Sequence, residues 1–195
     1  GTAARVDSLL DIVNDLLELA KMREGRARAP WAREVSLNQI LADIFDAVDP
    51  FASEANVELV PHFINEGAAV LDWAVPPDLV YAFENLIHNA IKYSKPGGGT
   101  VTVGLDIDRT HAMVVVGDDG IGIPADLQDD VFLEFVRAPN AKHARAEGTG
   151  LGLSIVREAA QMHGGKVSLE SAEGLGTTVT VVLPLHHVPP EIVDL

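Results

Sequence analysis

Apolar residues recur at steps of three and four through the first 25 residues of this 195-residue chain, a spacing that predicts a helix. The stripe consists of Val6, Leu9, Leu10, Val13, Leu16, Leu17 and Ala20. Ile12 and Leu19 widen it beyond a coiled-coil seam, which favours a helix packed in a bundle or against a second partner. An amphipathic helix folded back onto its own domain is the alternative. Residues 25–30 begin with glycine and end with proline, so we expect a linker there and a domain boundary near residue 30.

Residues 31–185 mix strand-like and helix-like patterns, and residues 186–195 form a tail. Ser36 is the expected N-cap of a helix that ends near Ser53, with Pro50 kinking its end. Further helices are expected at 76–93, 125–135 and 151–163, and strands at 57–63, 69–73, 100–107, 111–116, 166–171 and 177–183. The first two strands are joined by a turn-rich segment, and the next two form an antiparallel pair. This order predicts an α/β (α+β) sandwich, with a mixed, largely antiparallel sheet covered on one face by helices and the N-terminal helix outside the domain.

Charge and composition narrow the function. Fourteen Lys and Arg residues against 29 Asp and Glu give a net charge of −15, which repels phosphate backbones, so no nucleic-acid partner is expected. The absence of cysteine excludes a thiolate nucleophile and fits a reducing compartment. No apolar run approaches the ~18 residues of a membrane span. We expect a cytoplasmic domain, whether or not its parent protein is anchored to a membrane.

Residues 148–155, Gly-Thr-Gly-Leu-Gly-Leu-Ser-Ile, place three alternate glycines directly before a helical pattern. Backbone N–H groups of glycine can approach an anion closely, and the start of the following helix is partly positive. A phosphate-binding loop and a mobile loop that merely begins a helix both explain this segment. It is neither a P-loop nor a dinucleotide fingerprint, because the Gly-Lys-Ser/Thr ending and the surrounding βαβ unit are absent.

Polar residues share one face of the helix expected at 76–93. Asn85, Asn89 and Lys92 are spaced by four and three residues, while Leu86 and Ile87 turn toward the core. An asparagine oxygen suits Mg²⁺, which takes phosphate oxygens as further ligands, and a lysine one turn on can neutralise those phosphates. A polar face that is hydrogen-bonded without any ligand is the alternative.

A second candidate follows the strand expected at 111–116. In Gly117-Asp118-Asp119-Gly120-Ile121-Gly122, Asp118 can accept a hydrogen bond from a ligand amino group, such as that of adenine, while the glycines let the chain pass close by. A tight turn with solvated aspartates is equally compatible. A catalytic carboxylate pair is disfavoured, because adjacent residues of an extended chain point to opposite faces.

Four basic residues precede the glycine-rich segment: Arg137, Lys142, His143 and Arg145. In so acidic a chain they form a positive island that can close over a triphosphate as a lid. A solvated basic loop is the alternative interpretation.

The order of these segments closely resembles the catalytic ATP-binding domain of sensor histidine kinases of two-component systems, the GHKL or Bergerat-fold domain. Residues 84–93 resemble its N box, 118–124 its first glycine box, Phe132 and Phe135 its F box, and 148–154 its second glycine box. Residues 171–184 also match the family. The first helix is similar to the second helix of the family's dimerisation and phosphoacceptor hairpin, so the likeness covers residues 5 to 184.

The resemblance implies ATP and Mg²⁺ as cofactors. Asn89 would coordinate Mg²⁺, Asn85 and Lys92 would lie near the phosphates, and Arg137 would reach the terminal phosphate. Asp118 would accept the adenine amino hydrogen, with Tyr93 against the ring. The remaining implied ATP contacts are Gly120, Gly122, Ile123, Phe135, Gly148, Thr149, Gly150, Leu151, Gly152, Leu153 and Thr178, and the implied catalytic group is Asn85, Asn89 and Arg137. Phe132 and Phe135 would hinge the lid.

One departure concerns the phosphoacceptor. The histidines of this chain, none of which has the family's acceptor context, are His62, His88, His111, His143, His163, His186 and His187. We therefore expect a donor domain truncated before its acceptor and unable to phosphorylate itself. His163 is expected to cap a helix, and the adjacent histidines at 186–187 make only a weak metal site.

The resemblance implies Mg-dependent transfer of the ATP γ-phosphoryl group to a histidine of the parent kinase's hairpin. A response-regulator receiver domain would be the next partner, and residues 4–24 would form a homodimer contact. Two alternatives remain open: a regulatory ATP-binding module without transferase activity, and a related GHKL ATPase or anti-sigma serine kinase.

Overall fold

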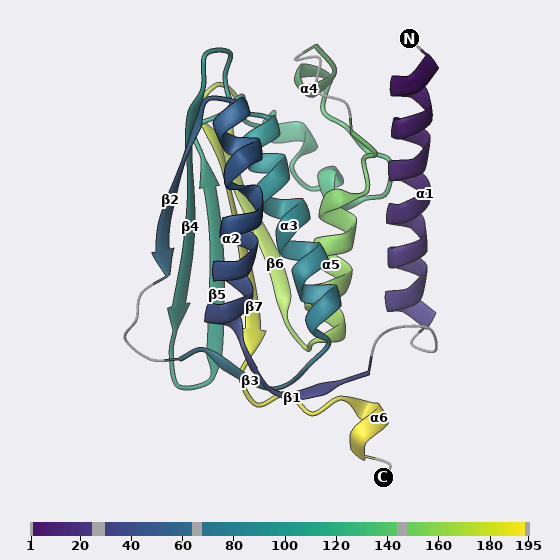
Figure 1. Cartoon of the computed structure of the whole chain (residues 1–195), viewed down its shortest axis with the longest axis vertical. Coiled ribbons are helices and arrows are strands. Elements are labelled where there is room, and N and C mark those ends of the chain that lie inside the picture. The colour runs from purple at the N-terminus through teal and green to yellow at the C-terminus, as the bar shows by residue number, and fades with distance from the viewer. Residues whose placement is uncertain (1, 25–29, 64–67, 144–147, 194–195) are drawn as a thin grey trace.

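The computed structural model describes residues 2–24, 30–63, 68–143 and 148–193. A sheet forms one layer, α2, α3 and α5 cover one of its faces, and α1 stands beside α5, away from the sheet (Figure 1). The helices are α1 (Thr2–Glu24), α2 (Leu37–Glu54), α3 (Pro76–Lys92), α4 (Pro139–His143), α5 (Gly152–Met162) and α6 (Pro190–Val193). The strands are β1 (Ala32–Ser36), β2 (Val57–Phe63), β3 (Val70–Ala74), β4 (Gly99–Ile107), β5 (His111–Asp118), β6 (Lys166–Ala172) and β7 (Gly176–Pro184). The predicted fold class is confirmed.

The five-stranded sheet has the order β2-β4-β5-β7-β6, in which only the β2–β4 pair is parallel. Alternate residues of its strands are buried beneath the helices, as the period-two pattern predicts, with Val103 and Leu105 of β4 opposite Val116 and Val114 of β5. A second, two-stranded sheet pairs β1 with β3 in antiparallel fashion. The strands expected at 57–63 and 69–73 are both present, and each belongs to a different sheet.

Helix α3 is the central helix of the covering layer, packed between α2 and α5. Leu79, Phe83 and Ile87 are almost fully buried on its core side, and the opposite side stays free for polar residues. Ser36 caps α2 as predicted, accepting a hydrogen bond from the backbone N–H of Gln39 at 3.2 Å. These packed helices fix the backbone from which the polar side chains of α3 project.

Helix α1 packs against α5, but not through its predicted stripe. Leu19 and Met22 are each 2% exposed, whereas the stripe residues from Val6 to Leu17 are 38–62% exposed. The helix therefore combines both expectations: one face folds back onto the domain, and the apolar seam stays available to a partner. The domain boundary near residue 30 stays a prediction, since residues 25–29 lie outside the described part.

One local expectation needs correction. The helix expected at 125–135 is a pair of 3₁₀ turns, Ala125–Leu127 and Asp130–Phe132, each too short for a helical face. Helix α2 ends at Glu54, next to the expected Ser53, with Pro50 near its end; the kink at Pro50 stays a prediction. The pattern gave no sign of strand β1, whose five residues pair only with β3. Among the described residues no helix has the length and apolar character that a membrane crossing requires.

Candidate functional site

A cavity of about 550 Å³ opens between α1, α3, the glycine-rich loop and the ends of the central strands. It collects segments that are far apart in the sequence, as the resemblance implied. The predicted site residues that line it are Asn85, Asn89, Lys92, Tyr93, Asp118, Gly122, Ile123, Arg137, Gly148, Thr149, Gly150, Gly152 and Leu153. Its volume lies in the range typical of small-molecule sites.

One wall is the polar face of α3, on which Tyr81, Asn85, Asn89 and Tyr93 follow at steps of four residues. The amide nitrogen of Asn85 donates to the carbonyl oxygen of Tyr81 at 2.8 Å, which turns the amide oxygen away from the helix backbone. Opposite this row stands Gly152, the first residue of α5. A Cβ at that position would lie 2.8 Å from Asn89 Nδ2 and 3.5 Å from Asn85 Oδ1. The missing side chain therefore leaves room beside two amide groups.

Asp118, at the end of β5, occupies the other end of the cavity. Its Oδ1 accepts the backbone N–H groups of Gly120 at 2.9 Å and Thr177 at 3.2 Å, and Oδ2 has no hydrogen-bond partner within the described residues. Burial raises the pKa of Asp118 to about 6, against the lowering effect of these two N–H groups. Asp119 points elsewhere and accepts from the Thr100 N–H at 3.0 Å, so the two carboxylates diverge as predicted. Of these two aspartates, Asp118 is the one that offers an acceptor to a ligand in the cavity.

The chain after Asp118 is held tightly against its neighbours. Gly122 has φ +67°, and a Cβ there would collide with the carbonyl oxygen of Ala172, so only glycine fits. Asn140 donates to the Gly122 carbonyl at 2.8 Å, and Ile123 donates its N–H to Ser171 Oγ at 2.8 Å. This part of the cavity is rigidly placed.

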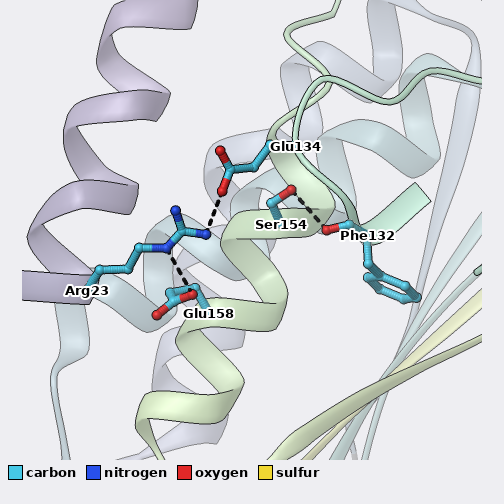
Figure 2. A network of polar contacts seen from close by, with 5 residues as sticks. All are labelled: Arg23, Phe132, Glu134, Ser154 and Glu158. Carbon is cyan, nitrogen blue, oxygen red and sulfur yellow. Dashed lines mark hydrogen bonds and ion pairs between the residues drawn. The ribbon is translucent and has the colours of Figure 1, made fainter. Parts of the chain in front are cut away.

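The glycine-rich loop is fixed from two sides. The N–H of Phe135 donates to the carbonyl oxygen of Gly150 at 2.8 Å, and Gly150 itself has φ +73°. Ser154, buried on α5, donates to the Phe132 carbonyl at 3.0 Å (Figure 2). The two phenylalanines expected to hinge a lid therefore contact this region through their backbones: Phe135 binds the glycine-rich loop, and Phe132 binds α5.

Four predicted contacts do not line the cavity. Gly120 packs against the Tyr93 carbonyl oxygen, where a Cβ would collide. Leu151 is fully buried in the core, and Phe135 is exposed. Thr178 is replaced by its neighbour Thr177, because successive residues of β7 face opposite sides of the sheet.

The predicted lid is only partly visible. Arg137 lines the cavity, whereas the side chains of residues 142 and 143 and the whole of 144–147 lie outside the described part. Closure of this basic segment over a ligand stays a prediction.

Helix α1 supplies cavity residues that the sequence interpretation missed: Ser8, Asp11, Asn14 and Asp15. Tyr81 of α3 was missed as well. Asp15 accepts hydrogen bonds from the hydroxyl groups of Tyr81 at 2.7 Å and Thr149 at 2.6 Å. The available signal was a row of polar residues between the apolar positions of the first helix, which solvent exposure alone would also explain.

Two histidines outside this cavity contact other parts of the domain. His163 ends α5 as expected and is 1% exposed; its Nε2 accepts the Val75 N–H at 3.0 Å and its Nδ1 lies 2.7 Å from the Ala159 carbonyl oxygen. His186 contacts Asp72 at 3.1 Å. No group of three His, Asp or Glu side chains suited to a metal occurs within the residues that the structure describes.

Comparison with known proteins decides the family. Residues 74–187 match the family described as "Histidine kinase-, DNA gyrase B-, and HSP90-like ATPase". The chain belongs to this ATPase family. The match includes Asn85, Asn89, Asp118 and the glycine-rich loop, so the predicted nucleotide contacts of this ATP-binding domain lie inside the matched region.

Relatives of this ATP-binding domain are sensor histidine kinases. WalK of Bacillus subtilis (strain 168) is 33% identical over 188 residues, 94% of this chain and 30% of WalK. RppB of Synechocystis sp. (strain ATCC 27184 / PCC 6803 / Kazusa) is 32% identical over 181 residues, 93% of this chain and 39% of RppB. The chain therefore spans about a third of the length of these two relatives.

Solved structures agree with the fold. The mycobacterial sensor histidine kinase MprB superposes with a TM-score of 0.66 and 29% identity, covering 80% of this chain and 99% of that one. Full-length ShkA in complex with AMPPNP has a TM-score of 0.72 and 26% identity, covering 94% of this chain and 37% of that one. The second superposition covers more of the ATP-binding domain's chain than the first.

Proposed function

We propose that this domain binds Mg-ATP and donates the γ-phosphoryl group to a histidine on a phosphoacceptor hairpin. The observation that carries the proposal is that the two ends of the cavity along α3 differ in their chemistry. A single acceptor, Asp118, lies at one end, and two asparagines and the glycine-rich loop lie toward the other. This arrangement suits a ligand with an amino-bearing base at one end and phosphates at the other.

The residues present fit Mg²⁺. Asn85 Oδ1 and Asn89 Nδ2 face the space left by Gly152, and rotating the Asn89 amide about its terminal bond would turn its oxygen, a hard ligand, into that space. Asn89 would hold the ion, with Asn85 beside it and phosphate oxygens completing the shell. Bound there, the ion would neutralise charge that develops on the transferring phosphoryl group.

The chain's own residues would position the reactants. Asp118 would fix the base, Lys92 and the loop N–H groups would hold the phosphates, and Arg137 would approach the terminal phosphate. An imidazole nitrogen of the acceptor attacks the terminal phosphorus, a P–N bond forms, and the bond to ADP breaks with the electron pair leaving on ADP. Catalysis by positioning and charge stabilisation is typical of phosphoryl transfer.

The wider context belongs to the same proposal. A response-regulator receiver domain would take the phosphoryl group from the histidine, and the exposed apolar seam of α1 (residues 6–17) suits a homodimer contact. We place the domain in the cytoplasm, where ATP and receiver domains are available.

A transfer assay tests the proposal. The 195-residue chain is incubated with γ-labelled ATP, Mg²⁺ and a separately purified hairpin protein from a sensor histidine kinase. The matched control hairpin carries glutamine in place of its acceptor histidine. Acid-labile label on the first hairpin and none on the control supports transfer; ATP binding without label on either hairpin supports the regulatory module instead.

A further inference from the structure

Helix α1 forms a wall of the nucleotide cavity, although it lies outside the region matched by the ATPase family. In Figure 1 it stands alongside α5, on the side away from the sheet. Its cavity-facing residues include two aspartates, Asp11 and Asp15, one turn apart, and no basic residue of α1 lines the cavity. The wall is therefore negatively charged.

Asp15 is held firmly in this wall. It is 8% exposed, its Oδ1 accepts from the Tyr81 hydroxyl at 2.7 Å, and its Oδ2 accepts from the Thr149 hydroxyl at 2.6 Å. Thr149 Oγ1 also accepts the Leu151 N–H at 3.1 Å, so the carboxylate is linked to the start of α5. One side chain thus joins α1 to both α3 and the glycine-rich loop.

The same face of α1 is anchored two turns further on. Leu19 and Met22 are buried, and Arg23 forms ion pairs with Glu134 at 2.6 Å and Glu158 at 3.3 Å (Figure 2). These contacts connect the end of α1 to the segment after the 3₁₀ turns and to α5. The contacts of Asp15 therefore belong to a helix that is docked through several residues, and they are not an isolated polar interaction.

Position along α3 shows which part of a nucleotide Asp15 would meet. Tyr93 ends the helix beside Asp118, since the Tyr93 carbonyl accepts the Ile121 N–H at 3.0 Å. Tyr81 lies three turns earlier on the same face, with the two asparagines between them. Asp15 binds Tyr81 and Thr149, so it lies at the opposite end of the cavity from Asp118, beside the phosphate-binding loop.

We propose that docked α1 selects nucleotides by phosphate charge: Asp15, reinforced by Asp11, disfavours a triphosphate relative to a diphosphate, so that ATP binding and α1 docking oppose each other. Like charges repel, the repulsion grows with each phosphate, and a carboxylate as buried as Asp15 is less screened by solvent than a surface one. The antagonism is reciprocal, because a ligand that binds the undocked state better must favour undocking. The proposal rests on the assignment of this cavity to ATP.

The test compares Asp15→Asn with Asp7→Asn. Asparagine keeps the size of the side chain and loses its charge; it can still contact both hydroxyls, accepting from one through Oδ1 and donating to the other through Nδ2. Asp7 is exposed on the same helix and does not line the cavity, so its variant removes an equal charge elsewhere. Affinities for ATP, ADP and adenosine are measured by calorimetry in Mg²⁺ buffer, and thermal unfolding verifies that each variant is folded.

Asp15→Asn should tighten ATP binding roughly tenfold, ADP binding about threefold and adenosine binding not at all. Asp7→Asn should leave all three affinities within about twofold of the parent. In the parent chain, amides of residues 15–22 should exchange hydrogen faster with saturating ATP than with saturating ADP.

Two outcomes overturn the inference alone: an unchanged ATP affinity in Asp15→Asn, or the same change for all three ligands. Identical exchange of α1 with ATP and ADP also counts against it. A parent chain that binds adenosine and ATP at no accessible concentration would instead refute the function proposed for the cavity.

Discussion

Protonation of Asp118 should weaken recognition of the adenine base. Its Oδ1 is occupied by two backbone N–H groups, which leaves Oδ2 as the acceptor for the base, and burial raises its pKa from 3.8 to about 6. A base amino group bound to Oδ2 favours the ionised carboxylate and lowers this pKa. Binding therefore releases a proton at pH values between the lowered pKa of the bound state and about 6.

The magnitude follows from the size of the shift. Below about pH 6 the affinity should fall by up to about tenfold per pH unit, so binding at about pH 5 should be roughly tenfold weaker than at about pH 7.5. The limit, reached if binding returns the pKa to its ordinary value, is about 3 kcal/mol. In the unliganded protein, the contribution of this group to stability is fully present below its unfolded pKa of 3.8 and is lost as the pH rises through about 6.

Calorimetry with adenosine, which carries no titrating phosphate, measures this effect at both pH values. Asp118→Asn should bind more weakly at the higher pH, by about 1.5–3 kcal/mol for the lost charged hydrogen bond, and should lose the pH dependence. His88 also lines the cavity and its pKa is lowered by burial, so any slope remaining in the variant belongs to other groups such as this one. Asp119→Asn is the matched control. Equal adenosine affinity of the parent chain at the two pH values would refute the reasoning.

Asn89→Ala should abolish the gain in ATP affinity that Mg²⁺ provides, since its amide oxygen is the assigned ligand; calorimetry with and without Mg²⁺ would contradict this if both proteins gained equally. Leu19→Ala removes a buried anchor of α1 and should lower the free energy of docking by about 2–3 kcal/mol, seen as faster hydrogen exchange of α1. Leu17→Ala, at an exposed position of the same helix, should not, and equal exchange in the two variants would argue against the docked face. His163→Phe leaves the Val75 N–H unpaired and should cost about 1–3 kcal/mol of unfolding free energy with ATP affinity unchanged; a variant with the parent's melting temperature would show that this hydrogen bond is dispensable.

Local patterns predicted the elements that carry the cavity. The spacing of Asn85 and Asn89 was enough to predict their shared face, because helical period and core burial leave only one orientation for α3. The glycines of the loop were equally informative, since a positive φ such as that of Gly150 excludes most other residues.

Contacts between distant segments were not predictable in this way. Asp15 reaches Thr149 across more than half the chain, and nothing in the first helix marks one aspartate among several as a partner. The choice between Thr177 and Thr178 depends on the register of β7 against β5, where a step of one residue reverses the face. The pairing of β1 with β3 likewise follows from tertiary packing rather than from their own short sequences.

The parallel pairing of β2 with β4 has a consequence for how the nucleotide site is acquired during folding. Parallel neighbours need a crossover, and α3 lies in the segment that connects these two strands. Pairing of the edge strand β2 with β4 therefore closes a long loop that contains Asn85 and Asn89. We expect such a closure to occur late in folding. A ligand that holds α3 would then protect amides of β2 that it never touches, coupling the occupancy of the cavity to the integrity of the sheet's edge.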